Sequence, residues 1–192
     1  MLKRILFFVL FAVVLFAGCG KKNGTYKTYW PNGKQKTEEN YKDGKRHGIN
    51  KEWYENGQLD SEVNYKDGKK HGVAKFYHQD GKLEQEIDYR DGKKQGFAKF
   101  YHETGKLDQE INYKDGKKQG IHKQWYPDGK LWKATPYENG EKHGIAKQWY
   151  ENELLRAEIN YKDGKMDGIA REWDGSGKLN VEVDYKAGKK HG

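Results

Sequence analysis

Histidine and cysteine are the side chains of this sequence best suited to metal binding and nucleophilic chemistry, and the chain has seven histidines and one cysteine. Four of the histidines recur at multiples of 24 residues: His47, His71, His143 and His191. In a repeated β-sheet such positions lie two strands apart, about 9 to 10 Å, whereas imidazole ligands must each reach a shared zinc at about 2 Å. We therefore expect no metal site in this column.

Catalytic chemistry has no matching pattern either. The repeated part of the chain contains no cysteine, no Ser/His/acid spacing and no Gly-rich phosphate loop that opens a helix. Its recurring Asp-Gly pairs are typical of turns. We expect neither an enzyme nor a bound cofactor, and function should lie in columns of equivalent residues.

The elements that position those columns come from one unit copied seven times. A glycine recurs every 24 residues from Gly24 to Gly192, without insertion or deletion. Such a fixed period predicts a repeat array over residues 24–192 rather than one globular core. The expected units are 24–47, 48–71, 72–95, 96–119, 120–143, 144–167 and 168–191.

The composition favours an ordered array with a thin core. Charged residues make up 34% of the chain and its net charge is +8, which alone would favour disorder. Aromatic residues, however, make up 14% and occupy fixed positions in every copy. Rings at fixed positions are expected to stack between neighbouring units.

The N-terminus predicts export. Lys3 and Arg4 precede an apolar run from Ile5 to Ala17, which is too short for a transmembrane helix of about 20 residues and is typical of a signal peptide, expected over residues 1–18. The following box, Phe16-Ala17-Gly18-Cys19, resembles the cleavage box of bacterial lipoproteins, with Phe16 where Leu is usual. This resemblance implies a lipid on Cys19, residues 19–23 as anchor and linker, and attachment to a cell membrane or outer membrane, facing the periplasm or the cell surface.

Each unit carries two turn signals, which predict β-hairpins. Pro31-Asn32-Gly33 favours a three-residue loop, and Asp43-Gly44 marks the second turn. With three-residue loops throughout, one face would carry the set Ile49, Trp53, Leu59, Val63 and Tyr65. The expected fold is all-β, an elongated single-layer antiparallel meander of about fourteen strands and ~65 Å, twisted and curved.

Two gapless aromatic columns are expected to form the core on one face, together with a lysine column that includes Lys51, while a glutamate column that includes Glu62 is expected on the opposite face. The columns are Tyr29, Trp53, Tyr77, Tyr101, Trp125, Trp149 and Trp173, and Tyr41, Tyr65, Tyr89, Tyr113, Tyr137, Tyr161 and Tyr185. A single sheet has little else to bury, so we interpret both as structural.

Positions that vary between copies are better candidates for function, because the fold does not dictate them. Phe76, Phe100, His78 and His102, with Trp132, form aromatic interruptions in the third to fifth copies. We expect these five residues to form a partner-contact surface.

The segment Tyr65-Lys-Asp-Gly-Lys-Lys-His-Gly72, together with Trp53-Tyr-Glu-Asn-Gly57, resembles the MORN repeat (membrane occupation and recognition nexus), in its bacterial variant form. The resemblance covers residues 24–192 and implies stacked hairpins that serve as scaffolds, dimerisation surfaces or lipid-contact surfaces. Many bacterial variants carry the label of antitoxin, which fits poorly with an exported chain.

The sequence thus predicts a lipid-anchored envelope protein whose sheet binds a protein or an envelope surface. An antitoxin-like or immunity protein that sequesters a toxin remains an alternative, as does binding of cell-wall glycan or a lipid surface. A homodimer is compatible with the aromatic face, and nucleic acid is not an expected partner because the chain is predicted to be exported.

Overall fold

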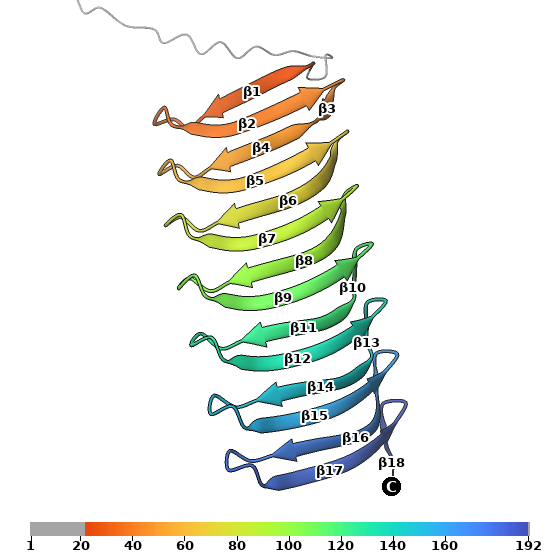
Figure 1. Cartoon of the computed structure of the whole chain (residues 1–192). Coiled ribbons are helices and arrows are strands. Elements are labelled where there is room, and N and C mark those ends of the chain that lie inside the picture. Colours follow the sequence, from red (N-terminus) through yellow and green to blue (C-terminus); the bar gives the residue numbers. More distant parts are fainter. Residues whose placement is uncertain (1–21, 192) are drawn as a thin grey trace, which may run out of the picture.

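The computed structural model describes residues 22–191, which form one antiparallel sheet of eighteen strands (Figure 1). Hairpins follow one another in chain order, so the sheet is a single elongated layer. The strands of its first half are β1 (Gly24–Tyr29), β2 (Gln35–Lys42), β3 (Lys45–Arg46), β4 (Gly48–Trp53), β5 (Leu59–Lys66), β6 (Lys69–Tyr77), β7 (Leu83–Arg90), β8 (Lys93–Tyr101) and β9 (Leu107–Lys114). Those of its second half are β10 (Lys117–Lys118), β11 (Gly120–Trp125), β12 (Leu131–Glu138), β13 (Glu141–Lys142), β14 (Gly144–Trp149), β15 (Leu155–Lys162), β16 (Lys165–Trp173), β17 (Leu179–Lys186) and β18 (Lys189–His191).

The predicted all-β meander is confirmed, with more strands than the expected fourteen. Three of the long strands are interrupted by one residue, which separates β3 from β4, β10 from β11 and β13 from β14, and β18 is a short terminal strand. At the first break the His47 N–H still donates to the Asn40 carbonyl at 2.8 Å. The breaks are local bends in the pattern of backbone hydrogen bonds and do not divide the sheet.

The first turn of each unit is the predicted three-residue loop. In the first unit, the Gly33 N–H donates to the Trp30 carbonyl at 2.9 Å, and the Trp30 N–H donates to the Lys34 carbonyl at 2.8 Å. Gly33 has a φ of 82°, so a type I turn is closed by a residue in the left-handed region. Pro31 fits because its fixed φ suits the first central position of that turn.

The second turn is shorter than predicted, and here the expectation of three-residue loops throughout is wrong. Lys42 pairs with Lys45, so only Asp43 and Gly44 lie in the turn. Their φ values are 51° and 73°, as a type I′ turn requires at both central positions. Asp tolerates the left-handed region better than most residues, which explains its recurrence here.

This shorter turn changes which residues share a face. Ile49 pairs with Asn64, Asn50 with Val63, and Gly48 with Tyr65. Directly opposed residues share a face and alternate residues along a strand point the same way. The predicted set is therefore divided: Ile49, Trp53 and Leu59 lie on one face, and Val63 and Tyr65 lie on the other.

The two aromatic columns consequently lie on opposite faces, in contrast to the prediction. The glutamate column is also reassigned, because Glu62 pairs directly with Lys51 and shares its face. We call the face with the Lys51 and Trp53 columns the ladder face, and the face with the Tyr65 column the tyrosine face.

The core lies on the tyrosine face. Its most buried apolar residues retain at most 7% of their accessible surface: Val63, Ala74, Ile87, Ala98, Ile111, Ala146 and Ala157. Small alanines opposite branched side chains, such as Ala74 opposite Ile87, let the sheet curve tightly over this row. Since the sheet has no second layer, this curvature supplies the burial, and Figure 1 shows the strands bending at the Asp-Gly end.

Side-chain hydrogen bonds join the first loop of one unit to the next unit. The Tyr54 hydroxyl donates to the Tyr77 carbonyl at 2.6 Å, and the Asn56 amide donates to the Gln79 carbonyl at 2.9 Å. Tyr126 and Tyr150 repeat the first of these contacts at 2.8 Å. The bonds fix the offset between neighbouring loops, so each unit is positioned by its neighbours.

Candidate binding surfaces

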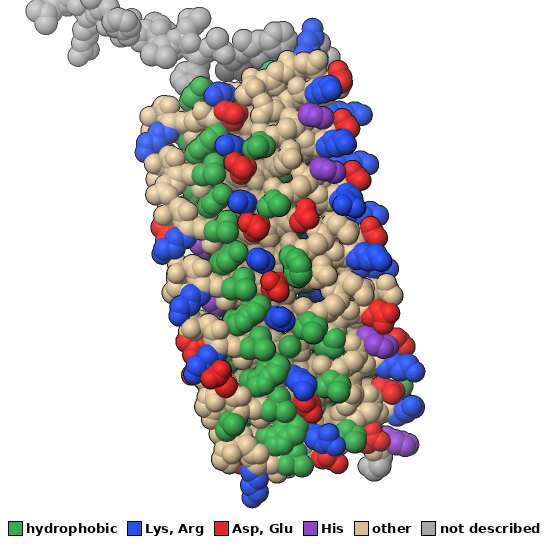
Figure 2. Space-filling view, in the orientation of Figure 1, with side chains coloured by type: hydrophobic (Ala, Val, Ile, Leu, Met, Phe, Trp, Pro, Cys, Tyr) green, Lys and Arg blue, Asp and Glu red, His purple; other side chains and the backbone are tan. Residues whose placement is uncertain are grey.

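An ion-pair ladder runs along the middle of the ladder face (Figure 2). Lys51 Nζ lies 3.0 Å from a Glu62 carboxylate oxygen, and the equivalent pairs Lys27–Glu38 and Lys147–Glu158 are 2.9 and 2.8 Å apart. The hydrogen bond from Lys27 lowers the pKa of Glu38 below its usual value. The Glu position is interrupted once, where Ala134 faces Lys123.

An exposed apolar row lies beside this ladder. Five equivalent residues keep 45 to 54% of their accessible surface: Ile49, Val73, Phe97, Ile121 and Ile145. Val73 and Phe97 line a shallow hollow together with the ladder residues Glu86 and Lys99. The sequence interpretation placed Ile49 in the core face and so missed this row. The signal that could have found it is the Asp-Gly pair, which favours a two-residue turn.

The first aromatic column lies on the other side of the ladder. In the second unit Trp53 is opposite Leu59, and the column is half-buried from that unit onward. Its first member, Tyr29, keeps 59% of its accessible surface. The column thus covers the ends of the strands next to the first loops and contributes apolar area to the ladder face.

On the tyrosine face, cations stack on the tyrosine column. The side-chain nitrogens of Lys70, Lys94, Lys118 and Lys142 lie 4.7 to 5.2 Å from the ring centroids of the next tyrosine along, respectively Tyr89, Tyr113, Tyr137 and Tyr161. This spacing is within the range of cation–π attraction. Burial raises the pKa of Tyr89 and of Tyr113. The lysines and tyrosines thus pack against one another along this column.

The residues predicted to contact a partner also lie on the tyrosine face and are half-buried. Phe76 and Phe100 are both opposite Gln85, on either side of strand β7, so they do not touch directly in the pairing. His102 Nε2 lies 3.6 Å from a carboxylate oxygen of Asp108.

His78 lies beside the first loop of its unit, where its N–H donates to the Lys82 carbonyl at 2.9 Å. The ring of Trp132 lies 6.2 Å from that of Tyr126. The structure therefore distributes these five residues over several repeats, and their role in partner contact stays a prediction.

The histidine column supports the turns. His47 Nδ1 lies 3.5 Å from both the backbone N–H nitrogen and the carboxylate of Asp67, in the following Asp-Gly turn. Gln95 and Gln119 occupy equivalent positions and accept the same turn N–H, at 3.0 and 3.1 Å. Glutamine replaces histidine without loss of the contact, which favours a structural role. Among residues 22–191 no group of three or more His, Cys, Asp or Glu side chains is arranged to hold a metal ion.

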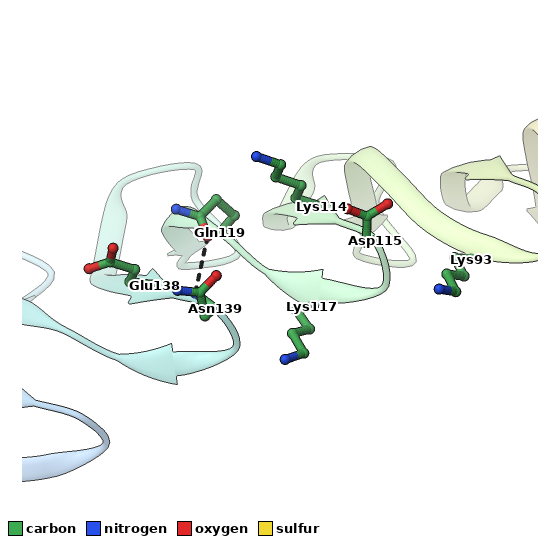
Figure 3. Close-up of a pocket in the computed structure, with 7 residues that line it drawn as sticks. All are labelled: Lys93, Lys114, Asp115, Lys117, Gln119, Glu138 and Asn139. Atoms are coloured by element: carbon green, nitrogen blue, oxygen red, sulfur yellow. Dashed lines mark hydrogen bonds between the residues drawn. The ribbon is translucent and has the colours of Figure 1, made fainter.

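The hollow beside the Asp115-Gly116 and Asn139-Gly140 turns is drawn in Figure 3. It is lined by Lys93, Lys114, Asp115, Lys117, Gln119, Glu138 and Asn139. The hydrogen bond from the Asn139 N–H to Gln119 crosses it, and the surrounding side chains project from successive turns without converging on one point. The hollow therefore offers no assembled set of catalytic groups.

The signal box and the lipidation site, Phe16, Ala17, Gly18 and Cys19, lie outside the described residues. Within residues 22–191 no helix has the length and apolar character needed to cross a bilayer.

The fold and its surfaces define a class of protein: an elongated array of stacked β-hairpins with two unlike faces. The chain belongs to the MORN repeat variant family, whose model matches residues 22–43, 46–67, 70–91, 94–115, 118–139, 142–163 and 166–187. Repeats of this family generally serve for binding or as scaffolds rather than as enzymes. No curated protein matches the chain.

Proposed function

We propose that this protein is a lipid-anchored scaffold of a bacterial cell envelope that binds a protein partner through the ladder face. The observation that carries the proposal is the exposed apolar row from Ile49 to Ile145, which keeps 45 to 54% of its accessible surface. Asn64, Asp88 and Asn112 stand opposite successive members of the row, so it is a line of exposed apolar side chains separated by polar ones, and exposed apolar side chains with a polar rim are a common feature of protein contact sites.

The ladder supports this choice of face. Its ion pairs neutralise the lysine and glutamate columns beside the apolar row, so a partner can cover the row without meeting a field of one sign. The row also extends over five units, because equivalent positions recur about every 9 to 10 Å. A partner can therefore engage several units at once, and the sum of weak contacts raises its affinity.

The proposed anchor rests on the signal-like sequence that ends at Cys19. Cys19 precedes strand β1 by only five residues, so a lipid on this cysteine would hold the first repeat close to the membrane and leave the remaining repeats to project from it. Two or more acyl chains give stable attachment at about 0.8 kcal/mol per buried methylene.

The test is site-specific photocrosslinking in cells that express the full chain. A photoreactive residue at Phe97 lies in the apolar row, and one at Phe76 lies on the tyrosine face in the predicted contact group. A control at Lys93 lies beside an Asp-Gly turn. We expect a discrete adduct from position 97 and none from position 93. Adducts from position 76 alone would move the contact surface to the tyrosine face.

Anchoring is tested in the same strains. Cys19→Ser is expected to abolish incorporation of a labelled fatty acid and to release the chain from the membrane fraction, and unchanged membrane retention would contradict the anchor. Protease treatment of intact cells then shows which side the array faces. An adduct with a toxin would favour the sequestering alternative, whereas an envelope protein would support the scaffold.

A further inference from the structure

The fifth and sixth repeats differ from the second, third and fourth on the tyrosine face, and three of the differences add positive charge or remove negative charge, whereas Met166 at the position of Lys70 removes one positive charge. Lys133 replaces Gln85 and Gln109. Trp132 and Arg156 replace a column of acids formed by Asp60, Glu84 and Asp108. The second, third and fourth repeats fold with the acidic residues in place, and the first and seventh carry Lys36 and Asn180 there, so the array itself does not require Trp132 and Arg156.

Lys133 lies on the same strand as Tyr137, whose ring is close to two lysines of the recurring column. Lys133 is opposite Gln124 on one side and Gln148 on the other, which places it in the middle of the face. On the same strand, Tyr137 is opposite Lys142 and stacks against Lys118, whose Nζ lies 4.9 Å from its ring centroid. Lys118 and Lys142 therefore lie beside the stretch of β12 that carries Lys133 and Tyr137, and we call these three lysines the lysine cluster.

The centre of this lysine cluster is polar. His122 occupies the position of the buried alanines and lies opposite Thr135, which is only 2% exposed. His122 Nε2 is 3.2 Å from Gln109 Oε1, and the histidine ring lies 6.2 Å from that of Tyr137. Among residues 22–191 no ion pair involves any of the three lysines, and Asp108 in the preceding repeat is engaged with His102.

Like charges dominate the electrostatics of this cluster, where Asp108 is the acid that acts on His122. Burial, followed by repulsion from Lys94 and Lys142, lowers the pKa of Lys118, and burial with repulsion from Lys142 lowers that of Lys133. Burial also lowers the pKa of His122 to about 4, so at neutral pH this ring is uncharged and can donate or accept a hydrogen bond. Half-buried cations that repel one another are stabilised by a bound counter-charge.

We propose that the tyrosine face of the fifth and sixth repeats binds a soluble linear phosphate chain, held by Lys118, Lys133 and Lys142. Phosphate oxygens match ammonium groups as strong charge-assisted acceptors. A chain suits the geometry because the cations are spread across neighbouring strands rather than gathered at one point. A flat bilayer surface suits it poorly, since these lysines are partly buried on the inward-curving face of the sheet.

The test is calorimetric titration of the full chain, solubilised in detergent, with inorganic tripolyphosphate. Lys133→Gln restores the residue found in two other repeats, so the variant should fold, which circular dichroism can verify. We expect it to weaken binding about tenfold, the loss of one charge-assisted contact. The matched control is Lys123→Gln, which removes the same charge from the same repeat on the ladder face and should change affinity by less than about twofold.

Three outcomes would overturn the proposal. The first is no measurable binding of tripolyphosphate by the unsubstituted chain at low salt. The second is equal loss of affinity in Lys123→Gln and Lys133→Gln, which would mean that tripolyphosphate responds only to the net charge of the chain. The third is binding only to vesicles that contain phosphatidylglycerol, which would assign the lysines to a lipid surface. This site and the ladder-face contact are on opposite faces, so failure of one leaves the other intact.

Discussion

The two faces of the sheet share one backbone but use their side chains differently. On the tyrosine face, alanines and branched residues are buried beneath a stacked column of tyrosines and lysines. On the ladder face, residues of similar hydrophobicity stay half-exposed beside ion pairs. The difference indicates that in a single-layer sheet curvature decides burial, so the more buried tyrosine face should contribute more to stability than the ladder face.

The strongest test of this difference places a carboxylate on each face in turn. Ala98 is fully buried, and Ala98→Asp should cost about 4 kcal/mol, because the charge has no partner there. The neighbouring substitution Phe97→Asp, on the half-exposed row, should cost less than about 1 kcal/mol. Urea denaturation followed by tryptophan fluorescence measures both. Similar losses for the two variants would mean that the faces are equivalent.

A smaller difference in stability is expected when the same substitution is made at two isoleucines. Ile111 is 5% exposed on the tyrosine face, and Ile121 is 52% exposed on the ladder face. We expect Ile111→Ala to lower the free energy of unfolding by about 2 to 3 kcal/mol and Ile121→Ala by about 0.5 kcal/mol. The same denaturation experiment measures both losses. A larger loss for Ile121→Ala than for Ile111→Ala would place the core on the ladder face.

The pH dependence of stability should depend on His122. Its pKa is about 4 in the folded chain and about 6.5 when unfolded, so the unfolded chain binds more protons in that interval. The contribution is fully present above pH 6.5 and is lost as the pH falls toward 4. It should amount to about 1 kcal/mol after allowance for partial exposure.

The control for this effect is His122→Ala, which restores the residue found at the equivalent positions 74, 98, 146 and 170. The difference between the stability curves of the two proteins isolates the histidine from carboxylates that titrate nearby. Parallel curves from pH 7 to pH 4 would show that burial does not lower the pKa of this ring.

The smallest expected effect concerns the ladder. The side chains of Lys51 and Glu62 are 3.0 Å apart and about one-third exposed. A double-mutant cycle with Lys51→Gln and Glu62→Gln should therefore give a coupling of about 0.5 kcal/mol. The coupling should shrink at high salt, because exposed pairs are screened. A salt-insensitive coupling above about 2 kcal/mol would mean that the ladder is a structural element of the fold.

Most of the fold was predictable because the repeat period and the turn residues are local signals. Pro31-Asn32-Gly33 specified its three-residue loop correctly, since the chemistry of each residue suits one position of that turn. The faces were not predicted correctly. The Asp43-Gly44 turn has two residues, and three residues, 71 to 73, stand against Asn64 alone between the pairs Tyr65–Lys70 and Val63–Ala74.

The prediction of the candidate surfaces depended on the number of residues in this second turn. An error of one residue in a turn exchanges the side chains between faces, which is why the exposed row at Ile49 was placed in the core. The lysine cluster was missed for a different reason. Its members come from three strands whose alignment emerges only once the register is known.

The strands lie across the long axis of the array, so the backbone hydrogen bonds between them run along that axis. A tensile force applied between the two ends would therefore break the hydrogen bonds of one strand pair at a time, as in unzipping, rather than shear many bonds together. The side-chain bonds from Tyr54 and Asn56 to the next loop would yield with each step. Under such a load the molecule would lengthen hairpin by hairpin at modest force, and the repeats that remain folded would keep their binding surfaces.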